Sequence, residues 1–279
     1  MKVYPFKIPK PNNNAIVYQE DIESIFYNEL HQHDEIQISF LSKGNGTLLL
    51  GNSFTNYYTG DIFVIGSNLP HAFKSDASSD EKSVMLSLFF TKDAFGNAFF
   101  DLPEFVELSS FFVNAQQGFQ LQSHQEEIKK WFYQLKNASQ FEQFLGLISI
   151  LKTISISEKK ILSDQTNLRQ YTDNEGKRMR TVLAYTLENS DKTITLNEIA
   201  NVANMTKNAF CKFFKKRTNK TYIQFLTELR IENACKFLQS DKDASVAEIA
   251  FKTGFGTIAN FNRRFKELKN TTPLTFKKL

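Results

Sequence analysis

One stretch decides the fold of the C-terminal half: Gly254-Phe-Gly-Thr-Ile-Ala-Asn-Phe-Asn-Arg-Arg-Phe-Lys266. Its Gly-Phe start is typical of a turn, and Thr257 is placed to cap a helix, because its hydroxyl can accept from an unpaired backbone N–H. Phe261 and Phe265 lie four residues apart, so they bury one side of that helix. The stretch therefore predicts the turn and second helix of a helix-turn-helix unit.

A second copy of this pattern lies about 50 residues earlier in the chain. The matching pairs are Leu196 with Val246, Ile199-Ala200 with Ile249-Ala250, Phe210 with Phe261, Phe214-Lys215 with Phe265-Lys266, Asn219 with Asn270, and Thr221 with Thr272. The register slips by one residue where each copy turns, and insertions concentrate in such connections. The duplication indicates two helix-turn-helix units, at about 195–217 and 245–268, joined by an amphipathic helix from Tyr222 to Gln239.

These segments closely resemble the AraC/XylS family of transcription regulators, from about Lys177 to Lys277. The matching motifs are Ala184-Tyr-Thr-Leu-Glu-Asn189, Ile194-Thr-Leu-Asn-Glu-Ile-Ala200, Ala209-Phe-Cys-Lys-Phe-Phe-Lys-Lys216, Leu229-Arg-Ile-Glu-Asn-Ala-Cys-Lys-Phe-Leu238, Val246-Ala-Glu-Ile-Ala250 and the stretch 254–266 followed by Thr272-Pro273. The resemblance implies that each unit places its second helix in a major groove, on one face of a duplex. Two such grooves lie roughly 34 Å apart.

The resemblance also implies two sets of DNA contacts. The base-edge candidates are Asn208, Cys211 and Lys212 in the first unit, and Ile258, Ala259, Asn260 and Arg263 in the second. The phosphate candidates, which position the protein without specifying sequence, are Thr206, Lys215, Thr257, Arg264 and Lys266. Arg263 could bind guanine through two hydrogen bonds and Asn260 could bind adenine, whereas the thiol of Cys211 reads bases poorly and could equally face the core.

Charge divides the chain in the same place. From Gly176 onward there are 20 Lys and Arg against 9 Asp and Glu, so this part carries +11, and the preceding part carries −7. Next to a DNA-binding motif, the asymmetry favours phosphate binding over a merely solvated face. The 279 residues, 41% of them hydrophobic, are enough for two folded domains. No apolar run reaches signal-peptide or membrane-span length, so a cytoplasmic protein without a membrane segment is expected.

The first part predicts short strands and then helices. Strand patterns cover 15–18, 35–41, 47–50, 61–65 and 84–90, and two helical faces follow, one with Ile128, Trp131, Phe132 and Leu135, the other with Phe141, Phe144, Leu145, Ile148 and Leu151. The predicted class is α+β: a cupin-like barrel or jelly roll over 1–120, a helical segment over 121–157 that covers the barrel or forms a dimer seam, a linker over 158–175, and an all-α DNA-binding domain over 176–279.

Polar residues in these strands point to an effector pocket. His31, His33, Gln37 and His71 resemble the metal-site pattern of cupins, in which two His, a carboxylate and a later His converge inside a barrel. Three imidazoles could hold a divalent transition metal, but Gln37 stands where the carboxylate is usual. The expectation is that these residues line the pocket with their nitrogens hydrogen-bonded and that no metal or other cofactor is held.

Three functions fit this organisation. In the favoured one, the barrel binds a small effector, a sugar being one candidate, and the effector changes how the basic half engages double-stranded DNA. In the others, the barrel is a metal-dependent enzyme fused to a DNA-binding domain, or serves only to dimerise the protein. We find no nucleophile motif or phosphate-binding glycine loop, so enzyme activity and catalytic residues are not expected. A homodimer is expected, with RNA polymerase as a further candidate partner.

Overall fold

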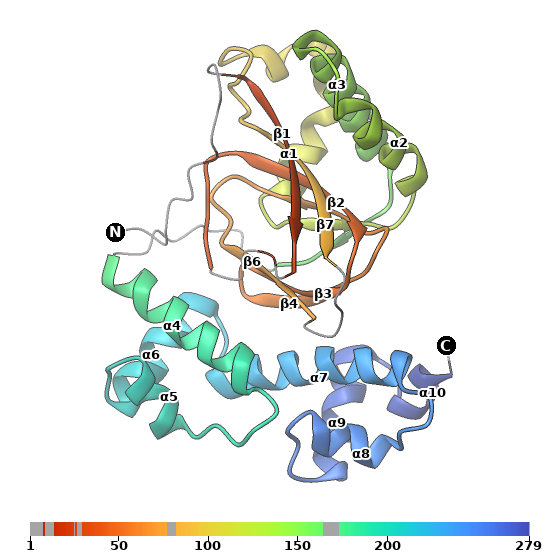
Figure 1. Cartoon of the computed structure of the whole chain (residues 1–279). Coiled ribbons are helices and arrows are strands. Elements are labelled where there is room, and N and C mark those ends of the chain that lie inside the picture. Colours follow the sequence, from red (N-terminus) through yellow and green to blue (C-terminus); the bar gives the residue numbers. More distant parts are fainter. Residues whose placement is uncertain are drawn as a thin grey trace. The chain divides into compact units, whose positions relative to one another are not determined.

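A computed structural model describes residues 8, 14–24, 26, 30–76, 82–163 and 173–278. They form two compact units, one built mainly from residues before 164 and the other mainly from 173–278. Figure 1 shows the strands before residue 164 and helices alone over 173–278. This confirms the predicted class of a strand-rich domain followed by a helical one. Among the described residues, no helix is long and apolar enough to cross a membrane.

The strands of the first unit form two sheets. The larger has the order β1-β7-β2-β5-β8-β9, and the smaller has the order β4-β3-β6. Their bounds are β1 (Ile16–Glu23), β2 (Ile36–Lys43), β3 (Gly46–Leu50), β4 (Ser53–Tyr57), β5 (Ile62–Ile65), β6 (His71–Ser75), β7 (Ser83–Phe90), β8 (Phe119–Leu121) and β9 (Lys159–Ile161). The five predicted strands are β1, β2, β3, β5 and β7, whereas β4 and β6 were missed because polar residues interrupt their alternation.

The two faces of β2 have different partners. Ile36, Ile38 and Phe40 belong to the cluster that the helices cover, whereas Gln37 and Ser39 alternate with them and are buried on the other face. Successive strand residues point to opposite faces of a sheet. The polar side chains therefore face the interior of the barrel, where a ligand would bind.

Helices α1 (Ser109–Ala115), α2 (Gln125–Leu135) and α3 (Gln140–Ile156) pack on the larger sheet (Figure 1). The buried face of α2 is as predicted. The predicted face of α3 is wrong at Phe141 and Leu145, which are 70% and 48% exposed. It is confirmed at Leu151, which is buried, and at Phe144 and Ile148, which pack against the same core. Its buried residues are Leu147, Ile150, Leu151 and Ile154 among others, and because α3 is apolar on several sides, periodicity alone did not select this stripe.

The predicted linker over 158–175 is wrong at both ends. Lys159–Ile161 is strand β9, which pairs with β8 through Phe119↔Ile161 and Leu121↔Lys159. Helix α4 begins at Asp173. Residues 164–172, the middle of that prediction, lie outside the described residues. The polar composition of 158–163 hid a strand that lies at a sheet edge.

The second unit is a run of helices: α4 (Asp173–Asn189), α5 (Leu196–Val202), α6 (Lys207–Thr218), α7 (Tyr222–Ser240), α8 (Val246–Lys252), α9 (Ile258–Lys269) and α10 (Pro273–Lys277). The predicted caps form, since the Thr206 hydroxyl accepts from the Ala209 N–H and that of Thr257 from the Asn260 N–H. The repeated Asn219 and Asn270 end α6 and α9 with φ of 56° and 55°, a left-handed conformation that asparagine tolerates better than most residues.

Helix α7 supplies the core between the two helix-turn-helix units. At its start, Tyr222 and Phe225 pack on the Phe210–Phe214 pair of α6. Further along, Ile231, Ala234 and Leu238 share a cluster with the Phe261–Phe265 pair of α9. Its predicted apolar face is wrong at Ile223, which is 46% exposed.

We expect Phe265→Ala to destabilise the second unit by about 3–5 kcal/mol, because it leaves a cavity where a fully buried ring packed. Scanning calorimetry of the full chain measures the change as a lower unfolding temperature. Phe251→Ala is the matched control, since Phe251 is 55% exposed. An equal loss in both variants would contradict the assigned core.

Candidate nucleic-acid interface and effector pocket

Helix α9 presents one polar face to solvent. Its turns bury Phe261 and Phe265 and leave the predicted base-edge residues exposed, namely Ile258, Ala259, Asn260 and Arg263. Of the predicted phosphate contacts, Thr257 and Lys266 are exposed and Arg264 is half-buried. This places the four base-edge candidates where a base edge can reach them, and their roles stay predictions.

Hydrogen bonds link the polar side chains of α9. Arg263 donates from Nη2 to Asn260 Oδ1 at 3.1 Å and from Nη1 to Glu267 Oε1 at 3.4 Å. Arg264 Nη1 donates to the other oxygen of Glu267 at 2.8 Å. One carboxylate thus binds both arginines of the helix. Glu267 was not among the predicted site residues, although its spacing of four from Arg263 and three from Arg264 is a signal for such pairs.

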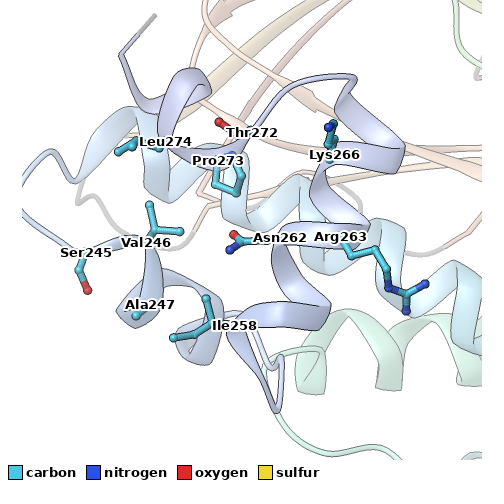
Figure 2. Close-up of a pocket in the computed structure, with 10 residues that line it drawn as sticks. All are labelled: Ser245, Val246, Ala247, Ile258, Asn262, Arg263, Lys266, Thr272, Pro273 and Leu274. Carbon is cyan, nitrogen blue, oxygen red and sulfur yellow. The ribbon is translucent and has the colours of Figure 1, made fainter.

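A groove of about 800 Å³ runs beside α9. Residues from three places line it: Ser245, Val246 and Ala247 at the start of α8, Ile258, Asn262, Arg263 and Lys266 on α9, and Thr272, Pro273 and Leu274 at the start of α10. Figure 2 shows Ile258 beside Ala247, whereas the guanidinium of Arg263 extends away from both. Ile258 therefore lies at the edge of the polar face rather than at its centre.

Helix α6 presents a different set of charges. Asn208, Lys212 and Lys215 are exposed, as predicted, and Cys211 is half-buried. In the repeat, Lys212 stands where α9 has Arg263, and Lys216 stands where α9 has Glu267. The charged residues on the exposed face of α6 are thus all basic, whereas those of α9 combine arginines with a carboxylate.

Close packing fixes the two helix-turn-helix units relative to each other. Arg230 of α7 donates from Nε to the Ser190 carbonyl at 2.7 Å and from Nη2 to the Lys192 carbonyl at 2.6 Å, both after α4. Gly254, in the turn of the second helix-turn-helix unit, packs against the same segment after α4 and against Arg230. A Cβ there would lie 2.7 Å from the Ser190 carbonyl oxygen and 2.8 Å from Arg230 Nε, and the φ of +88° also disfavours a side chain.

The structure brings the four predicted pocket residues together inside the barrel. His31, His33, Gln37 and His71 line a cavity of about 280 Å³. Three acidic or amide side chains from β1 (Gln19, Asp21, Glu23) and three aromatic rings (Phe26, Phe73, Phe89) line the same cavity. Sequence reasoning missed the β1 residues, because alternation alone does not say which sheet face bounds a pocket.

A chain of hydrogen bonds leads from the pocket residues His33 and Gln37 to the fully buried Ser39 and Ser87. His33 Nε2 lies 3.1 Å from Gln37 Oε1, Gln37 Nε2 donates to Ser39 Oγ at 2.7 Å, and Ser39 Oγ lies 2.8 Å from Ser87 Oγ. Burial lowers the pKa of His33 and lowers the pKa of His71 well below its usual range. Both imidazoles are therefore neutral at pH 7.

The three histidines are the one set of described residues that could hold a metal ion. One ring nitrogen from each histidine lies within 4.8 Å of the corresponding nitrogens of the other two. Gln37, at the position where cupins carry a carboxylate, contacts His33 instead. The arrangement offers three imidazole nitrogens as ligands beside the cavity.

Comparison with known families matches both halves of the chain. Residues 15–152 match an AraC-like ligand binding domain, and residues 199–279 match a helix-turn-helix domain. The HTH-type transcriptional regulator YdeC of Bacillus subtilis is 25% identical over 91% of this chain and 87% of its own. The melibiose operon regulatory protein of Escherichia coli is 22% identical over 89% of this chain and 83% of its own.

A third relative matches the DNA-binding part alone. The Transposon Tn10 TetD protein of Escherichia coli is 32% identical over 36% of this chain and 72% of its own. The matches extend across the barrel, the cavity and both helix-turn-helix units described above. The chain therefore belongs to the AraC family of transcriptional regulators, with an AraC-like ligand-binding domain followed by a helix-turn-helix domain that binds double-stranded DNA.

Proposed function

We propose that a small molecule bound in the barrel cavity controls how this regulator binds its operator. The observation that supports it most is the cavity of about 280 Å³, lined by both polar and aromatic side chains, within the domain that matches AraC-like ligand binding domains. That volume is at the small end of ligand pockets, which favours a molecule the size of a monosaccharide. One relative is named for the melibiose operon, which agrees with a sugar.

The lining of the cavity suits a sugar chemically. Gln19, Asp21 and Glu23 can accept or donate hydrogen bonds to hydroxyl groups. The faces of Phe26, Phe73 and Phe89 can pack on the C–H faces of a sugar ring. Monosaccharides screened by thermal stabilisation test this, because a ligand that binds the native state raises its stability by mass action. A stabilising sugar that leaves operator affinity unchanged would contradict the proposed control.

On the DNA, we infer that α9 supplies most of the sequence specificity and α6 mainly affinity. Arg263 has the planar fork that matches guanine, and Asn260 matches adenine. Lys212, Lys215 and Lys216 of α6 carry point charges suited to phosphate. All the predicted base and phosphate roles belong to this proposal, including those of Thr206, Asn208, Cys211, Ile258 and Ala259.

We expect Arg263→Ala to weaken operator binding by about 1–3 kcal/mol and to relax specificity at one base pair. Arg263→Lys is the matched control, because it keeps the charge and loses the two-pronged hydrogen bond. Fluorescence anisotropy with operator and with single-base variants of it measures both. If Arg263→Lys shows the same specificity as the parent protein, Arg263 is a phosphate contact and not a base contact.

We expect Glu267→Gln to raise affinity for random DNA. The difference in binding free energy between operator and random DNA would then shrink by about 1 kcal/mol. The change removes a negative charge from the DNA-facing side and releases two arginines that ion pairs now hold. Lys216→Gln makes the opposite change of charge at the equivalent position of α6. The affinity of both variants for operator and random DNA, measured over a range of salt concentrations, gives the comparison. If Glu267→Gln gains the same affinity for both DNAs, Glu267 does not contribute to specificity.

Other features of the proposal come from the sequence and the family. We propose that the barrel acts as a sensor and not as the active site of an enzyme, and that the protein works in the cytoplasm, where its DNA lies. Homodimerisation and contact with RNA polymerase stay predictions. Phe141 and Leu145, one turn apart and exposed on α3, offer an apolar surface for such contacts.

A further inference from the structure

Backbone pairing brings the three pocket histidines close together. His31 and His71 pair across an antiparallel bridge, with N–O distances of 3.0 and 2.9 Å between their backbone groups. Side chains directly opposite each other on such a pair lie on the same face. His33 follows two residues after His31, and the ring centroids of His31 and His33 lie 4.2 and 5.1 Å from that of His71.

Hydrogen bonds to backbone carbonyls fix the tautomers. His71 Nδ1 lies 2.8 Å from the Leu69 oxygen, and His33 Nδ1 lies 2.9 Å from the Glu35 oxygen. A carbonyl oxygen only accepts, so Nδ1 of His71 carries the proton and its Nε2 carries a lone pair. Nε2 of His33 faces Gln37 Oε1, so it offers a lone pair to a metal ion only when that amide turns away. Metal-ligating histidines in proteins are held by this kind of bond on the nitrogen that does not touch the metal.

One of these lone pairs has no partner. His71 is 1% exposed, and in the described part of the chain its Nε2 is buried without any hydrogen-bond partner. A buried polar atom left in this way costs about 1–3 kcal/mol. A metal ion is a partner that would satisfy it, together with the nitrogens of His31 and His33.

We propose that His31, His33 and His71 bind a divalent transition metal ion such as Zn²⁺ or Co²⁺, with its remaining coordination positions open to the cavity. A Zn–N bond of about 2.0–2.1 Å in a tetrahedral site places ligand nitrogens about 3.4 Å apart. The three histidines, whose nitrogens lie within 4.8 Å, reach this spacing by small side-chain rotations. Three protein ligands and an open position differ from the closed, four-ligand arrangement of structural zinc sites.

The metal site deepens the proposed effector control, on which its regulatory role rests. An ion on the histidine side of the cavity would favour an effector that carries oxygen donors, such as a vicinal diol or a hydroxy acid. The aromatic rings of the cavity would then pack on the rest of the effector. Gln37, next to His33, stands where a carboxylate would add a fourth, charged ligand.

Titration of the tag-free, chelator-treated full chain with Co²⁺ and Zn²⁺ tests the site, by visible absorption and by calorimetry. We expect one equivalent to bind, His71→Gln to weaken binding about 100-fold or more, and Gln37→Glu to strengthen it about tenfold. His124→Gln is the matched control, because His124 is exposed at the start of α2. Gln37→Glu keeps the test decisive even if His71→Gln fails to fold.

Three results would overturn the site: no stoichiometric binding, the same affinity in His71→Gln as in the parent protein, or a thiolate band that assigns the ion to Cys211 or Cys235. Operator binding measured on the same samples separates the two proposals. If operator binding responds to a small effector but no metal binds, the proposed function stands and the metal site is wrong. Metal binding without any response of operator affinity to metal or effector supports the site and removes the proposed control.

Discussion

The guanidinium of Arg230 joins parts of the DNA-binding unit that are far apart in the sequence. It donates to two carbonyls after α4 and packs beside the turn of the second helix-turn-helix unit. That turn must contain glycine, because a Cβ at Gly254 would collide with the Ser190 and Asp191 carbonyl oxygens and with Arg230 itself. Since a protein reads two major grooves only if its helices keep the spacing of the duplex, this packing is as necessary as any base contact.

A fixed spacing allows the two reading helices to differ. In the proposed division of roles, α6 holds the backbone of the duplex, and lysines can do so without fixed geometry. Helix α9 combines a guanidinium with an amide and a carboxylate that orient it, at 3.1 and 3.4 Å. A carboxylate facing DNA reduces affinity for any sequence, so its presence on α9 makes sense where discrimination matters more than strength.

How much the sequence could predict depends on whether a feature is local. Thr257, Phe261, Phe265 and Asn270 each act within a few residues of themselves, through a cap, an i, i+4 pair and a left-handed end, so the helix-turn-helix units could be predicted almost to the residue. The edge strand β9 could not, because it exists only through pairing with β8. The buried stripe of α3 is set by the sheet beneath it and not by the helix. The histidines were found through their resemblance to the cupin metal-site pattern, whereas the residues of β1 that share their cavity depend on tertiary packing.

The helices outside the barrel and the polar pocket inside it are two consequences of one arrangement. A strand buried on both faces is usually apolar on both, yet β2 alternates Ile36, Gln37, Ile38, Ser39 and Phe40. Helices α2 and α3 bury the outer face and supply the hydrophobic stabilisation of the sheet. The inner face is then free to carry amide and hydroxyl groups, which cost little because Gln37, Ser39 and Ser87 bond to one another. Nε2 of His71, which lines the same pocket, is buried without a hydrogen-bond partner among the described residues, and the proposed metal ion would satisfy it.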